Sequence, residues 1–197
     1  MPVSWGQVAG ALTGHHAATA PAEASDRAAV AVILRQGDRG IEILFIRRAE
    51  HPQDPWSGQM AFPGGRREPE DADLRETARR ETAEEIGVDL GASAELLGRL
   101  DEVRAMARMQ PLSLVIAPYV FRLTQPAQVR LSDEVRSVHW LPLDEMLHAR
   151  TRSTMDYVHE SRTLQFPCLR FDEIVVWGLT YRMFMSLAAL LEGGSQQ

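Results

Sequence analysis

GGRREPEDADLRETARRETAEEIGV, residues 64–88, is the stretch that decides how this chain folds and what chemistry it can perform. It predicts a helix behind a Gly-Gly loop, and at about 100° per residue Glu81, Glu84 and Glu85 share an arc of roughly 100° on that helix. Three carboxylates held this close repel one another, so a bound cation stabilises them. Hard oxygen ligands that leave coordination positions open suit Mg²⁺ or Mn²⁺, with substrate phosphates completing the shell. The stretch therefore predicts a divalent metal site.

The ends of this helix are indicated by the same residues. We expect it to run from about Ala72 to Ile86 and to stop at Gly87, because glycine commonly follows the last residue of a helix. An alternative is a solvated surface helix whose acidic residues pair with neighbouring arginines. Spacing alone leaves both interpretations open. The whole pattern of Gly-Gly, a polar loop and Arg-Glu-x-x-Glu-Glu-x-Gly favours the metal site.

This pattern resembles the Nudix box, the signature of hydrolases that cleave nucleoside diphosphates linked to another group. The family pattern is Gly, five residues, Glu, seven residues, then Arg-Glu-apolar-x-Glu-Glu-x-Gly-apolar. Gly65 matches the first glycine, and the second half is matched by Arg80, Glu81, Glu84, Glu85, Gly87 and Val88. Two positions depart from the pattern. Asp71 replaces the first Glu and is separated from Arg80 by eight residues instead of seven, and Thr82 occupies a position that is usually apolar.

The resemblance implies roles for the matching residues. Glu81 and Glu85 would be the principal metal ligands, and Glu84 a further ligand or the general base. A backbone carbonyl near Gly64 or Gly65 would complete the metal shell, since glycine allows close approach of the backbone. Arg80 would pair with a box glutamate and orient it.

Some residues around the box resemble the coenzyme A pyrophosphatase branch of the family. That branch has the same longer Gly-Gly-x-x-Asp/Glu-Pro-x-Asp loop and the sequence Gly-x-x-x-Phe-Pro-Gly-Gly before it, which is GQMAFPGG here. Its Leu-Leu-Thr-x-Arg-Ser motif corresponds to ILFIRR, in which Arg47 matches but the Thr and Ser are missing. An arginine of the branch, four residues before the glycine, is Asp54 in this chain. Near the C-terminus Trp177 and Gly178 match the branch.

The expected activity is thus metal-dependent hydrolysis of a diphosphate bond, with coenzyme A or an acyl-coenzyme A as the leading substrate. ADP-ribose or NADH is the alternative, and a non-catalytic nucleotide-binding relative is a third interpretation. Because all three box carboxylates are present, an enzyme is favoured.

Arginine binds phosphate well through its planar fork. Candidates for that role are Arg47 and Arg66, with Arg48 and Arg67 as further possibilities.

Composition restricts the other function classes. A net charge of −6 argues against nucleic-acid binding, and the chain contains no run of eighteen apolar residues for a membrane span. All 21 basic residues are arginine, which excludes Schiff-base lysine chemistry and a P-loop. The single cysteine, Cys168, cannot form an internal disulfide and is interpreted as a core residue. With no secretory signal, the cytoplasm is the expected location. The sequence leaves a homodimer open.

The chain is expected to form one α+β domain, a Nudix-type α/β/α sandwich with a mixed β-sheet. We assign residues 27–191 to this domain, residues 1–26 to an N-terminal helix and linker, and residues 192–197 to a frayed tail. Strands are predicted at AAVAVILRQ and IEILFIRR, joined by a turn at residues 37–40. Three more follow the box, at AELLGRL, SLVIAPYVFRL and EVRSVHWLPL, with RTLQFP as a further strand or hairpin arm. A long amphipathic helix is predicted over residues 172–191.

Other residues are weaker candidates for the site. A further acid from a loop could be supplied by Asp101, Glu102, Asp133 or Glu134, although a charged loop beside a strand explains each of them. Trp56, Phe62 or Tyr119 could stack on an adenine, although aromatic residues of strands belong to the core more often.

Overall fold

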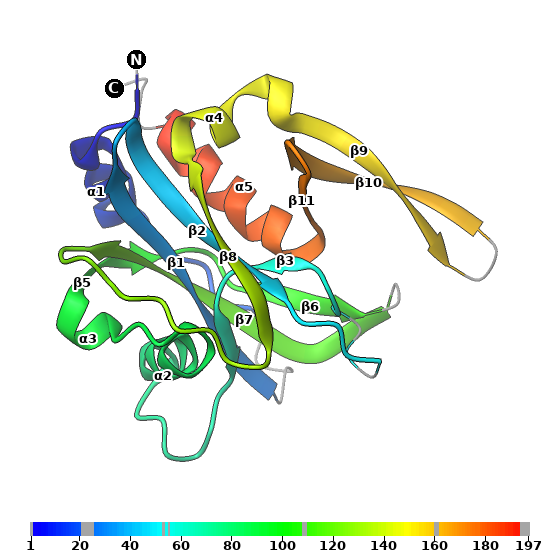
Figure 1. Cartoon of the computed structure of the whole chain (residues 1–197), viewed down its shortest axis with the longest axis horizontal. Helices are drawn as coiled ribbons and strands as arrows, with labels where there is room; N and C mark the ends of the chain where they lie inside the picture. The colour runs from blue at the N-terminus through cyan, green and yellow to red at the C-terminus, as the bar shows by residue number, and fades with distance from the viewer. Residues whose placement is uncertain are drawn as a thin grey trace.

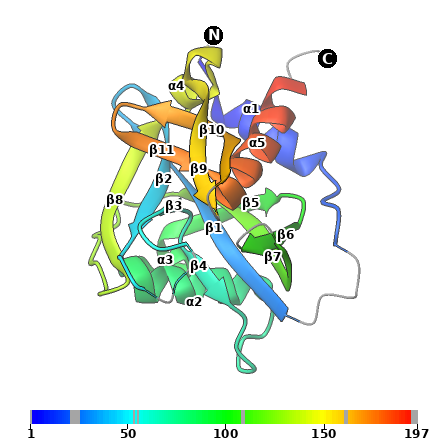
Figure 2. The same ribbon diagram turned by 90° about the vertical axis from the view of Figure 1, so that its right-hand side faces the viewer.

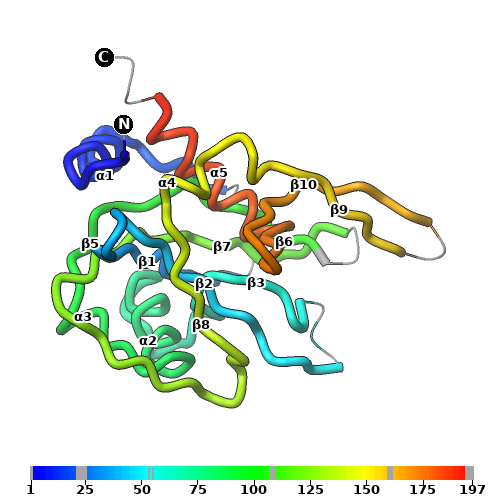
Figure 3. The backbone as a smooth tube through the Cα atoms, turned by 45° about the horizontal axis from the view of Figure 1, so that its top comes forward, coloured from blue at the N-terminus to red at the C-terminus, as the bar shows by residue number. Residues whose placement is uncertain are grey.

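The computed structural model describes residues 2–20, 26–52, 54, 56–107, 110–159 and 162–193. Its centre is a mixed sheet covered by helices on both faces (Figure 1). Helix α2 lies on one face, and α1 and α5 lie on the other, an arrangement that Figure 3 shows from a second direction. This is the α/β/α sandwich expected from the sequence.

The strands form two sheets. The eight-stranded sheet has the order β3-β2-β1-β7-β5, with β4 also paired to β1, β6 to β7 and β8 to β2. Strands β1 and β7 run parallel, whereas β2 pairs antiparallel with β1, which makes the sheet mixed. Its members are β1 (Asp26–Gly37), β2 (Gly40–Arg48), β3 (Met60–Ala61), β4 (Gly64–Arg66), β5 (Ala94–Arg99), β6 (Val103–Ala107), β7 (Gln110–Leu123) and β8 (Val135–Pro142).

Burial of β1 on both faces explains its unbroken apolar sequence. Val30, Val32 and Leu34 point into the cluster shared with α1 and α5, and the alternate residues Ala31 and Ile33 point into the cluster beneath α2. A strand with helices on both sides needs apolar residues at consecutive positions. The strand and turn predicted for this region are confirmed, because Gly37 pairs with Gly40 where β1 turns into β2.

Helix α2 (Leu74–Ile86) carries the box, and local signals determine its ends. The side chain of Asp73 accepts a hydrogen bond from the Glu76 N–H at the N-terminus, and Gly87 closes the C-terminus with φ of 71°. Thr82 is fully buried, and its hydroxyl donates to the Ala78 carbonyl at 2.7 Å. A polar residue is therefore tolerated at this normally apolar position because its hydrogen bond is made within the helix.

The C-terminal helix begins later than the sequence predicts. Instead of one helix from residue 172, the chain forms β11 (Ile174–Trp177) and then α5 (Gly178–Gly193). Isoleucine and valine at residues 174–176 are β-branched and pair with β10, and Gly178 has φ of 63°, which separates strand from helix. Tertiary pairing thus overrides the helical periodicity at this end.

A second, three-stranded sheet contains β11, β10 (Arg162–Phe171) and β9 (Arg152–His159). The β9–β10 hairpin extends away from the main body (Figure 1), and in Figure 2 it points toward the viewer. Cys168 of β10 is fully buried, as expected for a core residue. Three short helices complete the fold, namely α3 (Leu90–Ser93), α4 (Leu143–Leu147) and a 3₁₀ turn at Ala149–Thr151.

The N-terminal helix α1 (Trp5–Thr13) packs on the sheet through Val8 and Leu12, which are buried in the main core. Division of the chain into an N-terminal appendage and a hydrolase domain stays a prediction. Part of the predicted linker, residues 21–25, and residues 194–197 of the predicted tail lie outside the described residues. Among the helices that the structure describes, none has both the length and the apolar character for crossing a membrane.

Candidate functional site

Glu85 is the most buried carboxylate of the box. Its side chain lies between α2 and β4, and its Oε2 accepts a hydrogen bond from the Gly64 N–H at 2.9 Å. Glu85 is 4% exposed, and this burial raises the pKa of its carboxyl to about 7, with the charges of Glu81 and Glu134 adding to the effect. Burial therefore destabilises the ionised carboxylate more than the Gly64 N–H and the charge of Arg48 stabilise it.

Glu81 and Glu84 share one guanidinium. Nη1 of Arg80 donates to Oε1 of Glu81 at 3.0 Å and to Oε2 of Glu84 at 3.1 Å. Burial raises the pKa of Glu81 despite this partner, whereas Glu84 is exposed. A Cβ on Gly65 would collide with the Glu81 carboxylate, so a larger residue at this position would displace that side chain.

Asp71, which departs from the family pattern, anchors Arg80. Its carboxylate accepts hydrogen bonds from Nε and Nη2 of Arg80, both at 3.0 Å, from the Thr77 hydroxyl and from the Glu68 N–H. The Arg80 guanidinium is the main reason why the pKa of Asp71 lies well below its usual range. Despite the extra residue in the loop, an acid therefore remains in a position to orient Arg80. The box pattern in the sequence indicates an acid at this point of the loop.

Of the loop acids considered from the sequence, Glu134 is the one whose charge acts on the box, where it raises the pKa of both Glu81 and Glu85. Its loop is held against the box helix, since the Ser132 N–H donates to the Glu85 carbonyl at 2.9 Å. The Glu102 side chain is instead fully buried beside Arg27, with Oε1 2.6 Å from Nη2. Glu102 thus has a structural role.

The box has the donor chemistry for a divalent cation, although guanidinium groups now balance its charge. In the part of the chain that the structure describes, no three His, Cys, Asp or Glu side chains converge closely enough to hold a metal ion. The oxygen atoms of Glu81, Glu84 and Glu85 are hard ligands, and burial raises the pKa of Glu81 and Glu85. The donor types therefore suit a divalent cation, but the convergence of the three carboxylates that their helical spacing predicts is not found among the described residues.

The raised pKa of Glu85 predicts how stability depends on pH without divalent cations. A carboxyl with a pKa of about 7 when folded, against an ordinary 4.5, holds its proton more tightly in the folded chain. The free energy of unfolding should therefore fall as pH rises from about 4.5 to about 7, by up to about 3 kcal/mol. Denaturant titrations across this range should show a slope that Glu85→Gln removes and that Glu76→Gln, a control in the first turn of the same helix, retains. Equal slopes in all three proteins would contradict the prediction.

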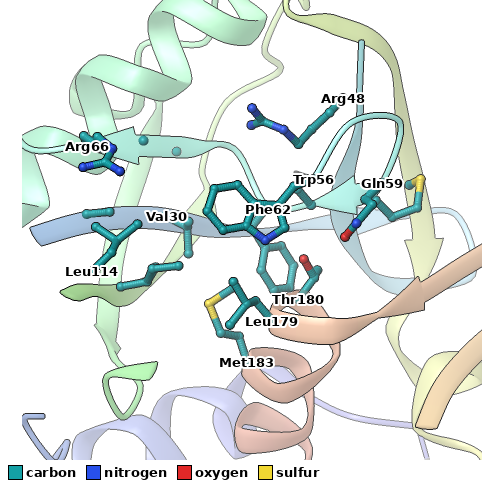
Figure 4. Close-up of a pocket in the computed structure, with 16 residues that line it drawn as sticks. Val30, Arg48, Trp56, Gln59, Phe62, Arg66, Leu114, Leu179, Thr180 and Met183 are labelled. Atoms are coloured by element: carbon teal, nitrogen blue, oxygen red, sulfur yellow. The ribbon is translucent and has the colours of Figure 1, made fainter. Parts of the chain in front are cut away.

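An apolar pocket of about 220 Å³ opens beside the box (Figure 4). Trp56 and Phe62 line it from the segment before the box, and Leu179 and Met183 line it from α5. Gly64, Gly65, Arg48 and Arg66 also line the pocket, so it adjoins the loop that contacts Glu81 and Glu85. The site can therefore hold an apolar or aromatic group next to a cluster of charged side chains.

The structure brings some of the predicted binding residues to this pocket and places others elsewhere. Arg66 lines it, as do Trp56 and Phe62. Arg47 is not among the described lining residues, and its charge instead lowers the pKa of His139 after the main effect of burial. Tyr119 packs beneath α2 on the opposite face of the sheet.

Two features of the pocket could not be predicted from the sequence. One is the wall that α5 contributes, and the other is that Arg48, and not Arg47, lines the pocket. The pattern at residues 172–191 indicated only an amphipathic helix, and no local signal relates that helix to the box. Arg48 could have been separated from Arg47 only by knowing that the pairing of β2 with β8 shifts between these residues.

Comparison with known proteins identifies relatives of this chain. A family model described as NUDIX domain matches residues 25–161. An uncharacterized protein of Schizosaccharomyces pombe is 38% identical over 135 residues, which cover 66% of this chain but only 40% of that protein. The peroxisomal coenzyme A diphosphatase ndx-8 of Caenorhabditis elegans is 32% identical over 171 residues, covering 82% of this chain and 68% of the relative.

Solved structures share the fold. A MutT/nudix family protein from Enterococcus faecalis superposes with a TM-score of 0.56 at 17% identity, covering 99% of this chain and 71% of that one. A C. elegans Ap4A hydrolase in a binary complex gives a TM-score of 0.51 at 23% identity, covering 64% of this chain and 88% of that one. At these identities the likeness concerns the fold alone.

Proposed function

The chain belongs to the Nudix family. We propose that it is a pyrophosphohydrolase that cleaves the diphosphate of coenzyme A or of an acyl-coenzyme A to 3′,5′-ADP and a phosphopantetheine. The observation that carries this proposal is the apolar pocket directly beside the box loop. A diphosphate at the box would place one of its two organic groups in that pocket. The 32% identity to a coenzyme A diphosphatase over 82% of the chain supports the choice of substrate.

Nudix hydrolases generally use divalent metal ions, and we propose that Glu81 and Glu85 hold Mg²⁺ or Mn²⁺ here together with Glu84. A carbonyl near Gly64 or Gly65 is proposed to complete the shell. When bound, the cation supplies neutralisation of the diphosphate oxygens and a lower pKa for the attacking water. These effects remove the charge repulsion that makes a diphosphate inert in water.

The chain's own side chains provide orientation and proton transfer in this proposal. Arg80, fixed by Asp71, holds Glu81 and Glu84 in place. Arg66 at the pocket rim supplies a guanidinium to the phosphates. Either Glu84 or Glu134 takes the proton from the attacking water, and water adds to phosphorus directly without a covalent enzyme intermediate. A phosphate role for Arg47 stays a prediction.

A substrate panel tests the proposal. Coenzyme A, acetyl-coenzyme A, ADP-ribose, NADH, diadenosine polyphosphates and nucleoside triphosphates would be incubated with and without Mg²⁺ or Mn²⁺, and products resolved by mass. We expect metal-dependent release of 3′,5′-ADP and phosphopantetheine. AMP from ADP-ribose or NADH, with coenzyme A left intact, would overturn the substrate assignment, and no turnover of any compound would favour a nucleotide-binding module.

ADP-ribose or NADH remains the second candidate substrate because Trp56 and Phe62 give the pocket aromatic surfaces on which an adenine could stack.

The cellular location and the oligomeric state stay predictions. The C. elegans relative is named as peroxisomal, whereas we expect this chain in the cytoplasm, and a homodimer is likewise a prediction.

A further inference from the structure

Arg48 and Asp54 form an ion pair at the rim of the pocket. Nε and Nη2 of Arg48 both lie 2.9 Å from Oδ2 of Asp54. Nη1, the third nitrogen, lies 3.9 Å from Oε1 of Glu85, too far for a hydrogen bond, and has no hydrogen-bond partner among the described residues. The pair thus fixes the guanidinium and leaves one of its ends directed at the box.

Asp54 also connects Arg48 to the wall of the pocket. Its second oxygen, Oδ1, accepts a hydrogen bond from the Trp56 N–H at 2.9 Å, and Trp56 lines the pocket together with Arg48. One carboxylate therefore positions both the guanidinium that faces the box and the backbone that carries the aromatic wall. Figure 4 shows Arg48 above Trp56 on the side of the pocket opposite Leu179 and Met183.

We propose that Arg48 binds a non-bridging oxygen of the substrate diphosphate through Nη1 and that Asp54 is its positioning residue. This inference rests on the proposed function, since it places a diphosphate between the pocket and the box. A guanidinium already held by a carboxylate loses little further freedom when it binds phosphate. Arg66 is less constrained, because its side chain is largely exposed and its ion-pair partner, Asp26, is exposed as well.

The sequence pattern agrees with this assignment. Where the resembling branch has serine and arginine, this chain has Arg48 and Asp54, and the structure places these two residues in contact. Compared with that motif, this chain has a basic side chain at the end of strand β2 and an acid at the loop position. The shift in the pairing of β2 with β8 between Arg47 and Arg48 occurs at this point in the strand.

Kinetics and phosphate binding test the proposal together. We would measure KM and kcat on the best substrate of the panel, and calorimetric binding of inorganic pyrophosphate without divalent cation. Arg48→Gln should raise KM and weaken pyrophosphate binding by about tenfold each, the scale of one charge-assisted hydrogen bond, with a smaller change in kcat. Asp54→Asn should give a weaker effect in the same direction. The matched control Arg136→Gln, from the exposed pair with Glu50, should change neither.

The double variant Arg48→Ser with Asp54→Arg moves the guanidinium back to the loop, and it should recover pyrophosphate affinity to within about threefold of the unmodified protein. Unchanged KM and pyrophosphate affinity in Arg48→Gln would overturn the proposal. So would a lower Tm with unchanged affinity, which would mean that the pair only stabilises the loop. If Arg48→Gln does not fold, Arg48→Lys replaces it in the test. Lysine keeps the positive charge but lacks the planar guanidinium, so this variant should still weaken pyrophosphate binding. Pyrophosphate lacks both organic groups, so this result does not depend on whether coenzyme A is the substrate.

Discussion

Replacing Glu85 with Gln is expected to lower kcat by roughly a hundredfold or more, the scale of losing one preorganised electrostatic group. Glutamine keeps the size of the side chain and can still accept the Gly64 N–H, but it removes the charge that we propose for metal binding. Steady-state hydrolysis of coenzyme A at limiting Mg²⁺ measures the loss. Near-normal turnover in that variant would remove Glu85 from the metal site.

The Glu85→Gln variant should remain folded, because the ionised carboxylate is an electrostatic burden in the absence of a cation. Its Tm without divalent cations should equal or exceed that of the unmodified protein near neutral pH. Adding Mg²⁺ should raise the Tm of the unmodified protein and not that of the variant, because ligand binding stabilises only the form that binds. Glu76→Gln is the matched control. Glu76 lies in the first turn of the same helix and pairs with Arg79 at 2.7 Å, away from the site.

Replacing Asp71 with Ala is expected to lower the free energy of unfolding by about 3 kcal/mol, the scale of removing one partner of a buried ion pair. Asp71 is 7% exposed, and Arg80 would lose two of its hydrogen bonds and keep its charge. Because Arg80 orients Glu81 and Glu84, kcat should fall as well, by about tenfold. Denaturant titration and steady-state kinetics measure the two effects.

The control for Asp71 is Glu68→Ala. Glu68 approaches the same guanidinium only to 3.9 Å and is exposed, so its removal should change stability by less than about 0.5 kcal/mol. The lowered pKa also has a consequence for pH. Stabilisation by Asp71 is complete above its ordinary value of 3.8 and is lost as pH falls below it toward the folded value. Equal stability of the two variants at neutral pH would show that the Asp71–Arg80 pair is not structural.

Local signals in the sequence predicted the box helix well. Its carboxylates, its buried face and its end at Gly87 depend on spacing within one turn, and the structure confirms the helix at Leu74–Ile86. The hairpin of β1 and β2 was predictable for the same reason, because its turn and its apolar strands are adjacent in the chain.

Long-range pairing could not be predicted in the same way. Residues 174–176 read as helix until their pairing with β10 is known. The short strand β4 exists because Gly64 and Gly65 lie against β1, a contact between segments more than thirty residues apart. At the site, Arg47 and Arg48 differ only through a shift in strand pairing. Their assignment therefore required the three-dimensional arrangement.

The wall that α5 contributes to the pocket separates two tasks along the chain. The carboxylates proposed for bond cleavage are encoded within five residues of the box, whereas Leu179 and Met183, which contact whatever enters the pocket, are encoded almost a hundred residues later. The family match itself ends at residue 161, before this wall begins. Substitutions in α5 could thus change which molecule is accepted while the bond-breaking apparatus stays the same, and new selectivity could arise without rebuilding the chemistry.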